Sequence, residues 1–243
     1  MKLIAFAKRC TKEILRDPLT LLFGLGFPLV ILLLLSAIQS NIPVDLFNIE
    51  NLAPGIVVFG LSFMTLFSAT LLAKDKESSL LERLFTTPLK SSDYILGYML
   101  PIIPISILQS LICYIASIFL GLTIKIDILY ALLMVTPISI FYTSLGLLCG
   151  SLLNVKQVGG ICGALLTNLS AWFSGVWFDL NLVGGFFAKI SNFLPFVHFV
   201  ELQRAIINQT FIEALPHLYI VLIYALVTLI AAILVFLIKR KRY

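Results

Sequence analysis

Charged residues are scarce in this chain. Lys, Arg, Asp and Glu make up 12% of its 243 residues, and hydrophobic residues make up 60%. Soluble domains average about 25% charged residues, so a water-soluble globule around a single core is excluded. Apolar runs of about 20 residues recur, and each is long enough to cross a bilayer as a helix. The sequence therefore predicts an all-α polytopic membrane protein, because helices satisfy their own backbone hydrogen bonds in lipid.

Catalytic and metal-binding motifs are also absent from the sequence. There is no Gly-Lys pair, hence no Walker A loop, and neither HExxH nor GxSxG occurs. We therefore expect a chain that is not an enzyme, with no catalytic residues and no cofactor or metal of its own. The four cysteines form no CxxC motif and are expected to act as small hydrophobic residues. His198 and Glu201 are three residues apart, but two ligands are too few for a metal site, and a polar surface contact is favoured.

Six apolar runs predict membrane spans within one domain covering residues 1–243. They occupy about residues 19–38, 53–73, 94–120, 128–150, 158–177 and 217–238. Pro101 and Pro104 predict a kink in the third span, and Pro137 predicts one in the fourth. The longest connection, 178–216, has apolar residues at helical spacing but is too charged to span. It predicts a short outer re-entrant helical hairpin that dips into or lies on the membrane surface.

Residues 1–17 predict an amphipathic helix at the membrane interface. Its partial apolar stripe consists of Leu3, Ile4, Ala7, Ile14 and Leu15, and the cationic residues Lys8, Lys12 and Arg16 lie elsewhere on the helix. This pattern is typical of a helix that lies on the lipid bilayer, so the bilayer is an expected partner.

Basic residues predict the orientation of the chain. Of the 17 Lys and Arg residues, 14 fall in the two termini and in the second and fourth loops. The positive-inside rule then places both termini and residues 74–93 in the cytoplasm. Because topology explains the basic residues, we expect no nucleic-acid partner. We expect a multi-pass protein of a bacterial cytoplasmic membrane.

The polar residues inside the predicted spans are mainly hydroxyls and amides. The candidates for lining a transport pathway are Ser62, Thr65, Ser68, Asn168 and Ser170. Such groups can instead join helices, at about 0.6 kcal/mol each, and the sequence leaves both readings open. Gly159 and Gly163 have GxxxG spacing, which favours close helix packing. The scarcity of ionisable residues inside spans argues against an ion-coupled transporter.

The most charged stretch, residues 74–93, holds eight of the 29 charged residues. Its centre predicts a short helix with an apolar face formed by Leu80, Leu81, Leu84 and Phe85. Glu77, Glu82 and Arg83 lie on other faces, and Pro88 ends the helix. The pattern alone is equally compatible with a helix resting on the membrane surface.

This stretch resembles the first cytoplasmic loop of ABC-2 type permeases, the membrane subunits of ABC exporters. The matching motifs are Asp75-Lys76-Glu77, the run from Leu81-Glu82 to Thr87-Pro88, and Ile95-Leu96-Gly97. Two departures are Ser79-Leu80, where the family often has Gly-Thr, and Tyr98, where it usually has a basic residue. Arg16-Asp17-Pro18 and Leu194-Pro195 followed by Glu201-Leu202-x-Arg204 resemble two further family patterns.

The resemblance implies a permease that exports an amphiphile such as a drug, peptide or lipid. A separate ABC ATP-binding subunit would hold ATP and Mg and dock on a coupling helix through Glu77, Leu80, Leu81, Glu82, Arg83, Leu84, Phe85 and Pro88. A second copy of the chain, or a homologous permease, would complete the pathway, with the second and fifth spans lining it. The alternatives are an ion-coupled secondary transporter or channel and a membrane-embedded enzyme such as a lipid transferase.

Overall fold

Helices are the only regular secondary structure in the described residues. The computed structural model describes residues 2–42, 47–85, 91–178 and 180–240, and every regular element in these ranges is helical. Within them, five stretches are long and apolar enough to cross a bilayer: Leu22–Gln39, Ile49–Glu77, Asp93–Phe119, Asp127–Leu152 and Phe211–Lys239. The prediction of an all-α polytopic membrane protein is confirmed.

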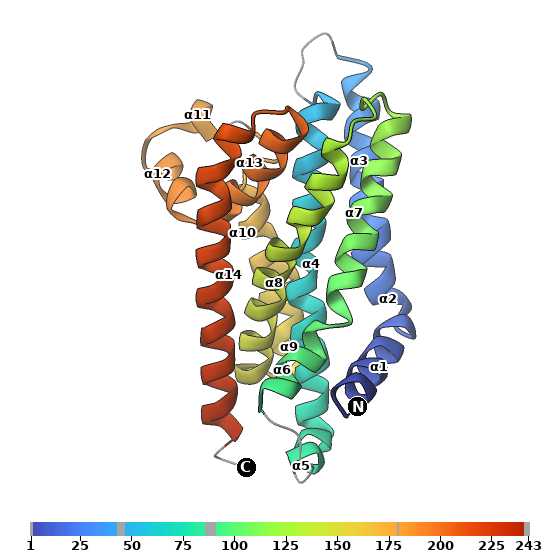
Figure 1. Cartoon of the computed structure of the whole chain (residues 1–243), viewed down its shortest axis with the longest axis vertical. Helices are drawn as coiled ribbons and strands as arrows, with labels where there is room; N and C mark the ends of the chain where they lie inside the picture. Colours follow the sequence, from blue (N-terminus) through green and yellow to red (C-terminus); the bar gives the residue numbers. More distant parts are fainter. Residues whose placement is uncertain (1, 43–46, 86–90, 179, 241–243) are drawn as a thin grey trace.

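The helices are arranged around α4 (Figure 1). In chain order the elements are α1 (Lys2–Leu15), α2 (Pro18–Leu21), η1 (Leu22–Gly26), α3 (Phe27–Gln39), α4 (Ile49–Glu77), α5 (Leu80–Phe85), α6 (Ser91–Met99), α7 (Ile102–Phe119), α8 (Asp127–Leu152), α9 (Val155–Val158), η2 (Gly159–Leu166), α10 (Thr167–Trp172), α11 (Leu180–Val183), α12 (Gly185–Phe193), α13 (Pro195–Ile207) and α14 (Phe211–Arg240). α4 is buried along most of its length. This burial follows from its sequence, which is apolar all round rather than on one face.

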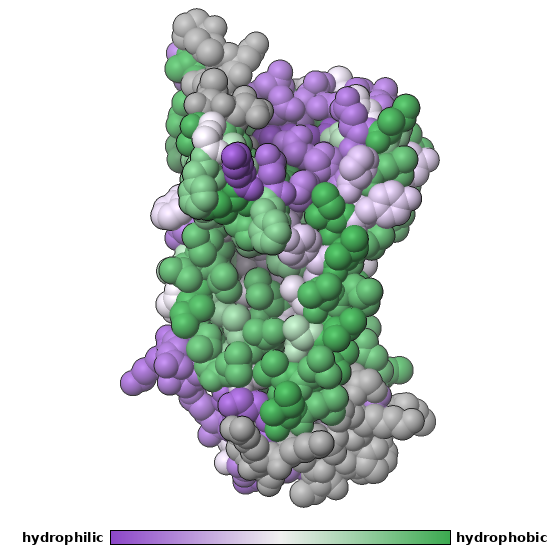
Figure 2. Space-filling model, turned by 90° about the vertical axis from the view of Figure 1, so that its left-hand side faces the viewer, coloured by the Kyte–Doolittle hydropathy of each residue, from purple (hydrophilic) through white to green (hydrophobic). Residues whose placement is uncertain are grey.

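The two ends of the bundle differ in their elements (Figure 1). We call the end that carries α1, α5, α6 and the last turn of α14 the base, and the end that carries α11, α12 and α13 the top. Both ends of the described chain lie at the base. Figure 2 shows an apolar belt between more hydrophilic ends, as expected for a surface that faces lipid between two aqueous phases.

The predicted fifth span, 158–177, is not among the five long stretches found in the described residues. Its residues form consecutive short segments, α9, η2 and α10, and the helix ends at Trp172. η2 is π-helical and contains Gly159, Gly160 and Gly163. Glycine is a poor helix former, which accounts for an irregular helix here. Ala69 and Ala73 of α4 pack against Val158 and Cys162 of this element.

The prolines inside the predicted third and fourth spans have different effects on their helices. The third predicted span is divided into α6 and α7 at Leu100-Pro101, which confirms the kink expected near Pro101. Pro137 lies inside α8, which is assigned as one continuous helix. At the top, the predicted hairpin consists of α11, α12 and the deeply buried α13, and residues 211–216 already belong to α14.

Close packing of α4 against α8 depends on two glycines of α8. A Cβ on Gly146 would overlap the carbonyl oxygen of Thr65 and the Oγ of Ser68, and a Cβ on Gly150 would lie 2.7 Å from the carbonyl oxygen of Ala69. In contrast, nothing lies within 4 Å of a Cβ placed on Gly159. The GxxxG spacing that brings helices together is therefore Gly146–Gly150 of α8, and not Gly159–Gly163 of η2.

Gly146→Ala should destabilise the protein by about 2 kcal/mol, because the added methyl group meets the backbone of α4 rather than a movable side chain. Unfolding in detergent micelles, followed by circular dichroism during SDS titration, measures the change. Gly159→Ala is the matched control and should be neutral or slightly stabilising, since alanine is the better helix former. Equal effects of the two substitutions would contradict the packing assignment.

Candidate functional site: a charged junction at the base

α1, predicted as an interfacial helix, lies across the base with one apolar face against the bundle (Figure 1). Phe6, Cys10 and Ile14 are buried, and the ring of Phe6 meets that of Tyr98 edge-on at a centroid distance of 5.0 Å. Ile4 and Leu15, from the predicted stripe, are 68% and 57% exposed and point away from this core. α1 therefore has two apolar sides, one packed against protein and one uncovered.

A buried carboxylate joins α1 to α4 and α6. Asp75, near the end of α4, is 1% exposed. The Arg9 guanidinium donates to both carboxylate oxygens, with Nη2 to Oδ1 at 2.6 Å, and the hydroxyl of Tyr98 donates to Oδ2 at 2.7 Å. Arg9 also pairs with Glu13 at 2.7 Å. A buried charge is tolerated only when it is paired and hydrogen-bonded, and this arrangement meets that requirement.

The next two residues tie α4 to the corner between α8 and α9. Lys76 Nζ donates to the carbonyl oxygens of Gly150 at 3.1 Å and Leu153 at 2.7 Å, at the end of α8. Glu77 Oε1 accepts a hydrogen bond of 2.9 Å from the backbone N–H of Val155, at the start of α9. Each charge complements the partial charge of the helix end that it meets. Asp75-Lys76-Glu77 therefore connects α4 to α1, α6, α8 and α9, and we call this set of contacts the base junction.

The predicted coupling helix follows directly after the base junction. Ser79 adopts a left-handed conformation with φ of 56°, which turns the chain sharply between α4 and α5. In α5, Leu81 is 5% exposed and Leu84 packs against the core, where its carbonyl oxygen accepts a hydrogen bond from Tyr94. Leu80 is half-buried, and Glu82 and Arg83 are exposed at the base (Figure 1). Pro88 and the side chain of Phe85 lie outside the described residues.

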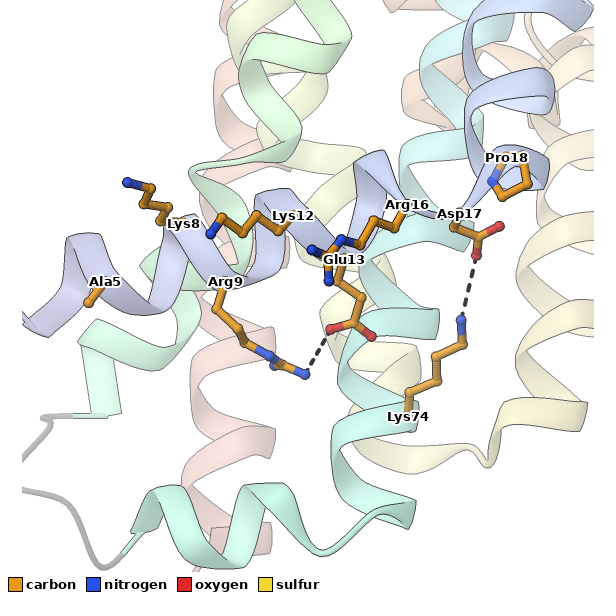
Figure 3. Close-up of a pocket in the computed structure, with 9 residues that line it drawn as sticks. All are labelled: Ala5, Lys8, Arg9, Lys12, Glu13, Arg16, Asp17, Pro18 and Lys74. Carbon is orange, nitrogen blue, oxygen red and sulfur yellow. Dashed lines mark ion pairs between the residues drawn. The ribbon is translucent and has the colours of Figure 1, made fainter.

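Three cationic residues lie on the exposed side of α1. Figure 3 shows Lys8 and Lys12 projecting away from the Arg9–Glu13 pair, and Arg16 follows one turn later. Lys8, Lys12 and Arg16 are all exposed. Near the end of α1, Asp17 pairs with Lys74 of α4 at 3.5 Å. This second ion pair also holds α1 to α4.

Burial and hydrogen bonding shift the pKa values of three α1 residues beside the base junction. The hydrogen bond to Asp75 raises the pKa of Arg9, so the guanidinium stays charged. Burial raises the pKa of the Cys10 thiol to about 12, so this cysteine is a thiol at neutral pH. Burial also raises the pKa of Glu13, against the opposing effect of Arg9. Because only the thiolate is nucleophilic, Cys10 serves packing rather than chemistry.

The candidate pathway hydroxyls are buried and hydrogen-bonded within the chain. Ser62 and Ser68 donate to carbonyl oxygens of their own helix, and Thr65 donates to the carbonyl oxygen of Tyr142 at 3.0 Å. Ser170 pairs with the Tyr142 hydroxyl at 2.5 Å. Asn168 is exposed and donates to the carbonyl oxygen of Ala164. Only the contacts of Thr65 and Ser170 join separate helices. A role of these five residues in a pathway stays a prediction.

At the top, Arg204 holds three elements together. Its guanidinium donates to Glu201 at 2.8 Å, to the carbonyl oxygen of Gly175 at 3.0 Å and to that of Asn51 at 3.2 Å. The Glu-Leu-x-Arg motif therefore acts as a structural brace between α13, the start of α4 and the residues after α10.

Two polar contacts at the top were not found from the sequence. His198 Nδ1 lies 2.8 Å from His217 Nδ1, so one ring donates and the other accepts. The buried Gln203 accepts from the Tyr114 hydroxyl at 2.8 Å and donates to the carbonyl oxygen of Ala131 at 3.0 Å. Only the tertiary fold brings these groups together, and no local pattern identifies them.

Removing Arg9 should leave the Asp75 carboxylate buried with only Tyr98 as a side-chain partner. Arg9→Met should therefore lower the free energy of unfolding by about 2 kcal/mol, and Arg9→Met/Asp75→Leu should recover part of that loss. Arg16→Met on the exposed side of α1 is the control and should change stability by less than about 0.5 kcal/mol. An additive double variant would show that the pair contributes no coupling energy.

Ser79→Gly should stabilise the protein by roughly 0.5–1 kcal/mol, because a left-handed backbone is strained for serine and not for glycine. Thermal unfolding in detergent measures the change. Ser78→Gly, at φ of −83°, is the matched control and should not stabilise. A lower melting temperature for Ser79→Gly would contradict strain at this turn.

Comparison with known proteins identifies the family of the chain. The sequence profile of the family described as ABC-2 type transporter matches residues 1–208. A protein named as a candidate transport permease, ycf38, from Cyanophora paradoxa is 26% identical over 224 residues, which cover 86% of this chain and 75% of that protein. Proteins with the same name from Porphyra purpurea and Pyropia yezoensis are 34% and 33% identical over 123 residues, which cover 48% of this chain and 42% of theirs. The chain thus aligns with less than half of the length of these two relatives. The match over residues 1–208 places the chain in the ABC-2 type transporter family.

Proposed function

We propose that this chain is the membrane-spanning permease subunit of an ATP-binding cassette exporter. The base junction is the observation that carries the proposal. Asp75, Lys76 and Glu77 connect the residues directly before α5 to α1, α6, α8 and α9. Because these contacts are charged and partly buried, a displacement of α5 is transmitted to four other helices. This is the property that a docking element for an energy-supplying partner requires.

A separate ATP-binding subunit supplies the energy in this proposal. The chain has no Gly-Lys pair within its 243 residues, so ATP and Mg belong to the partner. α5 presents Glu82 and Arg83 at the base, where a soluble subunit can reach them. The charge asymmetry of the loops supports a cytoplasmic location for the base and for both termini, in the cell membrane.

Transport takes place, in this proposal, between two copies of the chain or between the chain and a homologue. The nucleotide bound to the ATP-binding subunit shifts the balance between two arrangements of the helices through the base junction. The transport pathway is then open at the base in one arrangement and at the top in the other. In this proposal the second and fifth predicted spans line the path, and Asn168 is the exposed member of the candidate set. The apolar spans support an amphiphilic substrate.

The direct test is transport by the reconstituted complex. The chain is co-expressed with ATP-binding subunits of the same genome, purified as a complex and placed in proteoliposomes. ATP-dependent movement of an amphiphilic fluorescent dye toward the side of the top supports the proposal. Movement driven by a proton or sodium gradient without ATP would overturn it in favour of a secondary transporter.

Glu82→Lys should reduce the copurified ATP-binding subunit and the ATP-dependent transport rate by about tenfold, because it reverses an exposed charge at the docking surface. Its melting temperature should stay at the wild-type value, since Glu82 is exposed. Lys189→Glu, an exposed charge reversal at the top, is the matched control and should leave subunit binding unchanged. Undiminished transport by Glu82→Lys would contradict docking through α5.

A further inference from the structure

The uncovered apolar side of α1 forms one wall of a groove. The groove has a volume of about 720 Å³ and lies between α1 and the junction of α6 with α7. Ile4 and Leu15 line it from α1, and Leu100, Pro104 and Leu108 line it from the other side. The break between α6 and α7 lies in this second wall, where Leu100 and Pro101 both line the groove.

The groove opens toward the hydrocarbon of the membrane. Leu100 and Leu108 belong to the membrane-spanning stretch Asp93–Phe119 and are 44% and 47% exposed. Leu111, one turn further along α7, is exposed on the same stretch. A soluble subunit cannot reach this depth, whereas a lipid acyl chain can enter from the side.

A cationic edge borders the groove. Lys8 and Lys12 line both the groove and an open pocket of about 800 Å³ beside it, which Arg16 and Lys74 also line (Figure 3). Lys8 and Lys12 are four residues apart, so their Cβ atoms lie about 5–6 Å from each other on one face of α1. Both are exposed, and neither forms an ion pair with any residue of the described ranges. Two ammonium groups at this spacing suit a single phosphate.

We propose that this groove is a binding site for an anionic glycerophospholipid, with an acyl chain along Leu100, Pro104 and Leu108 and the headgroup phosphate between Lys8 and Lys12. The apolar groove and the cationic edge adjoin each other in the order in which a phospholipid presents its tail and its headgroup. The phosphate of an anionic headgroup is attracted to both lysines. A zwitterionic headgroup carries its own cation, which repels the lysines and weakens that attraction. The site does not depend on the proposed export function, because it can bind lipid whether or not transport uses ATP.

Native mass spectrometry of the full chain tests the site. The protein, purified in detergent, is offered equal amounts of dioleoyl phosphatidylglycerol and dioleoyl phosphatidylcholine. Wild-type protein should retain phosphatidylglycerol preferentially. Lys8→Gln/Lys12→Gln should reduce its retention at least about tenfold, since each basic residue near an anionic lipid contributes roughly fivefold. Ile4→Ser/Leu15→Ser should lower the retention of both lipids.

Lys125→Gln/Lys189→Gln removes the same charge from exposed positions outside the base and should keep the wild-type preference. Inorganic phosphate at millimolar concentration should not displace the lipid. Displacement by phosphate, or an unchanged preference in Lys8→Gln/Lys12→Gln, would overturn the proposal. If that variant kept its lipid preference but lost a copurified ATP-binding subunit, the cationic edge would belong to the protein interface instead.

Discussion

The buried Asp75 carboxylate is the constraint on which the base depends. A single charged group near the end of the central helix requires partners, and Arg9 of α1 and Tyr98 of α6 supply them. α1 is consequently held across the bundle instead of lying free on the membrane. The neighbours Lys76 and Glu77 use the same helix end to satisfy the carbonyl and amide groups of the α8–α9 corner. Electrostatic satisfaction therefore adds to the burial of Phe6, Cys10 and Ile14 in fixing the geometry at this end.

Elsewhere, steric fit determines how the helices meet. In lipid there is little hydrophobic gain from bringing two apolar helices together, so small residues and shape govern the contact. Gly146 and Gly150 let α8 lie directly on the backbone of α4. Polar contacts then orient individual helices, as Gln203 does between α7 and α8 at the top. The bundle therefore combines a charged base, a tightly packed centre and a hydrogen-bonded top.

The sequence predicted the parts of this structure that depend on local patterns. Hydropathy located the long spans, and the apolar face of Leu80, Leu81, Leu84 and Phe85 located α5, because each signal lies within one segment. The partners of Asp75 were not predictable, since Arg9 is 66 residues away in the chain. The contact between His198 and His217 likewise arises only when α13 packs on α14. The irregular segment η2 was predicted as a regular span because its composition is apolar, whereas its glycines weaken the helix.

The three consecutive charged residues of the base junction also fix the length of α4. Successive residues of a helix point about 100° apart, so Asp75, Lys76 and Glu77 address three different directions. Thr65 of α4 meets Gly146 of α8. Inserting or deleting one residue of α4 between Thr65 and this triplet would rotate all three charges at once. Each would then face the wrong neighbour, and a buried carboxylate would lose its guanidinium. Substitutions at the few partly buried positions of α4, such as Leu66 and Thr70, are thus tolerated far more easily than any change in its register.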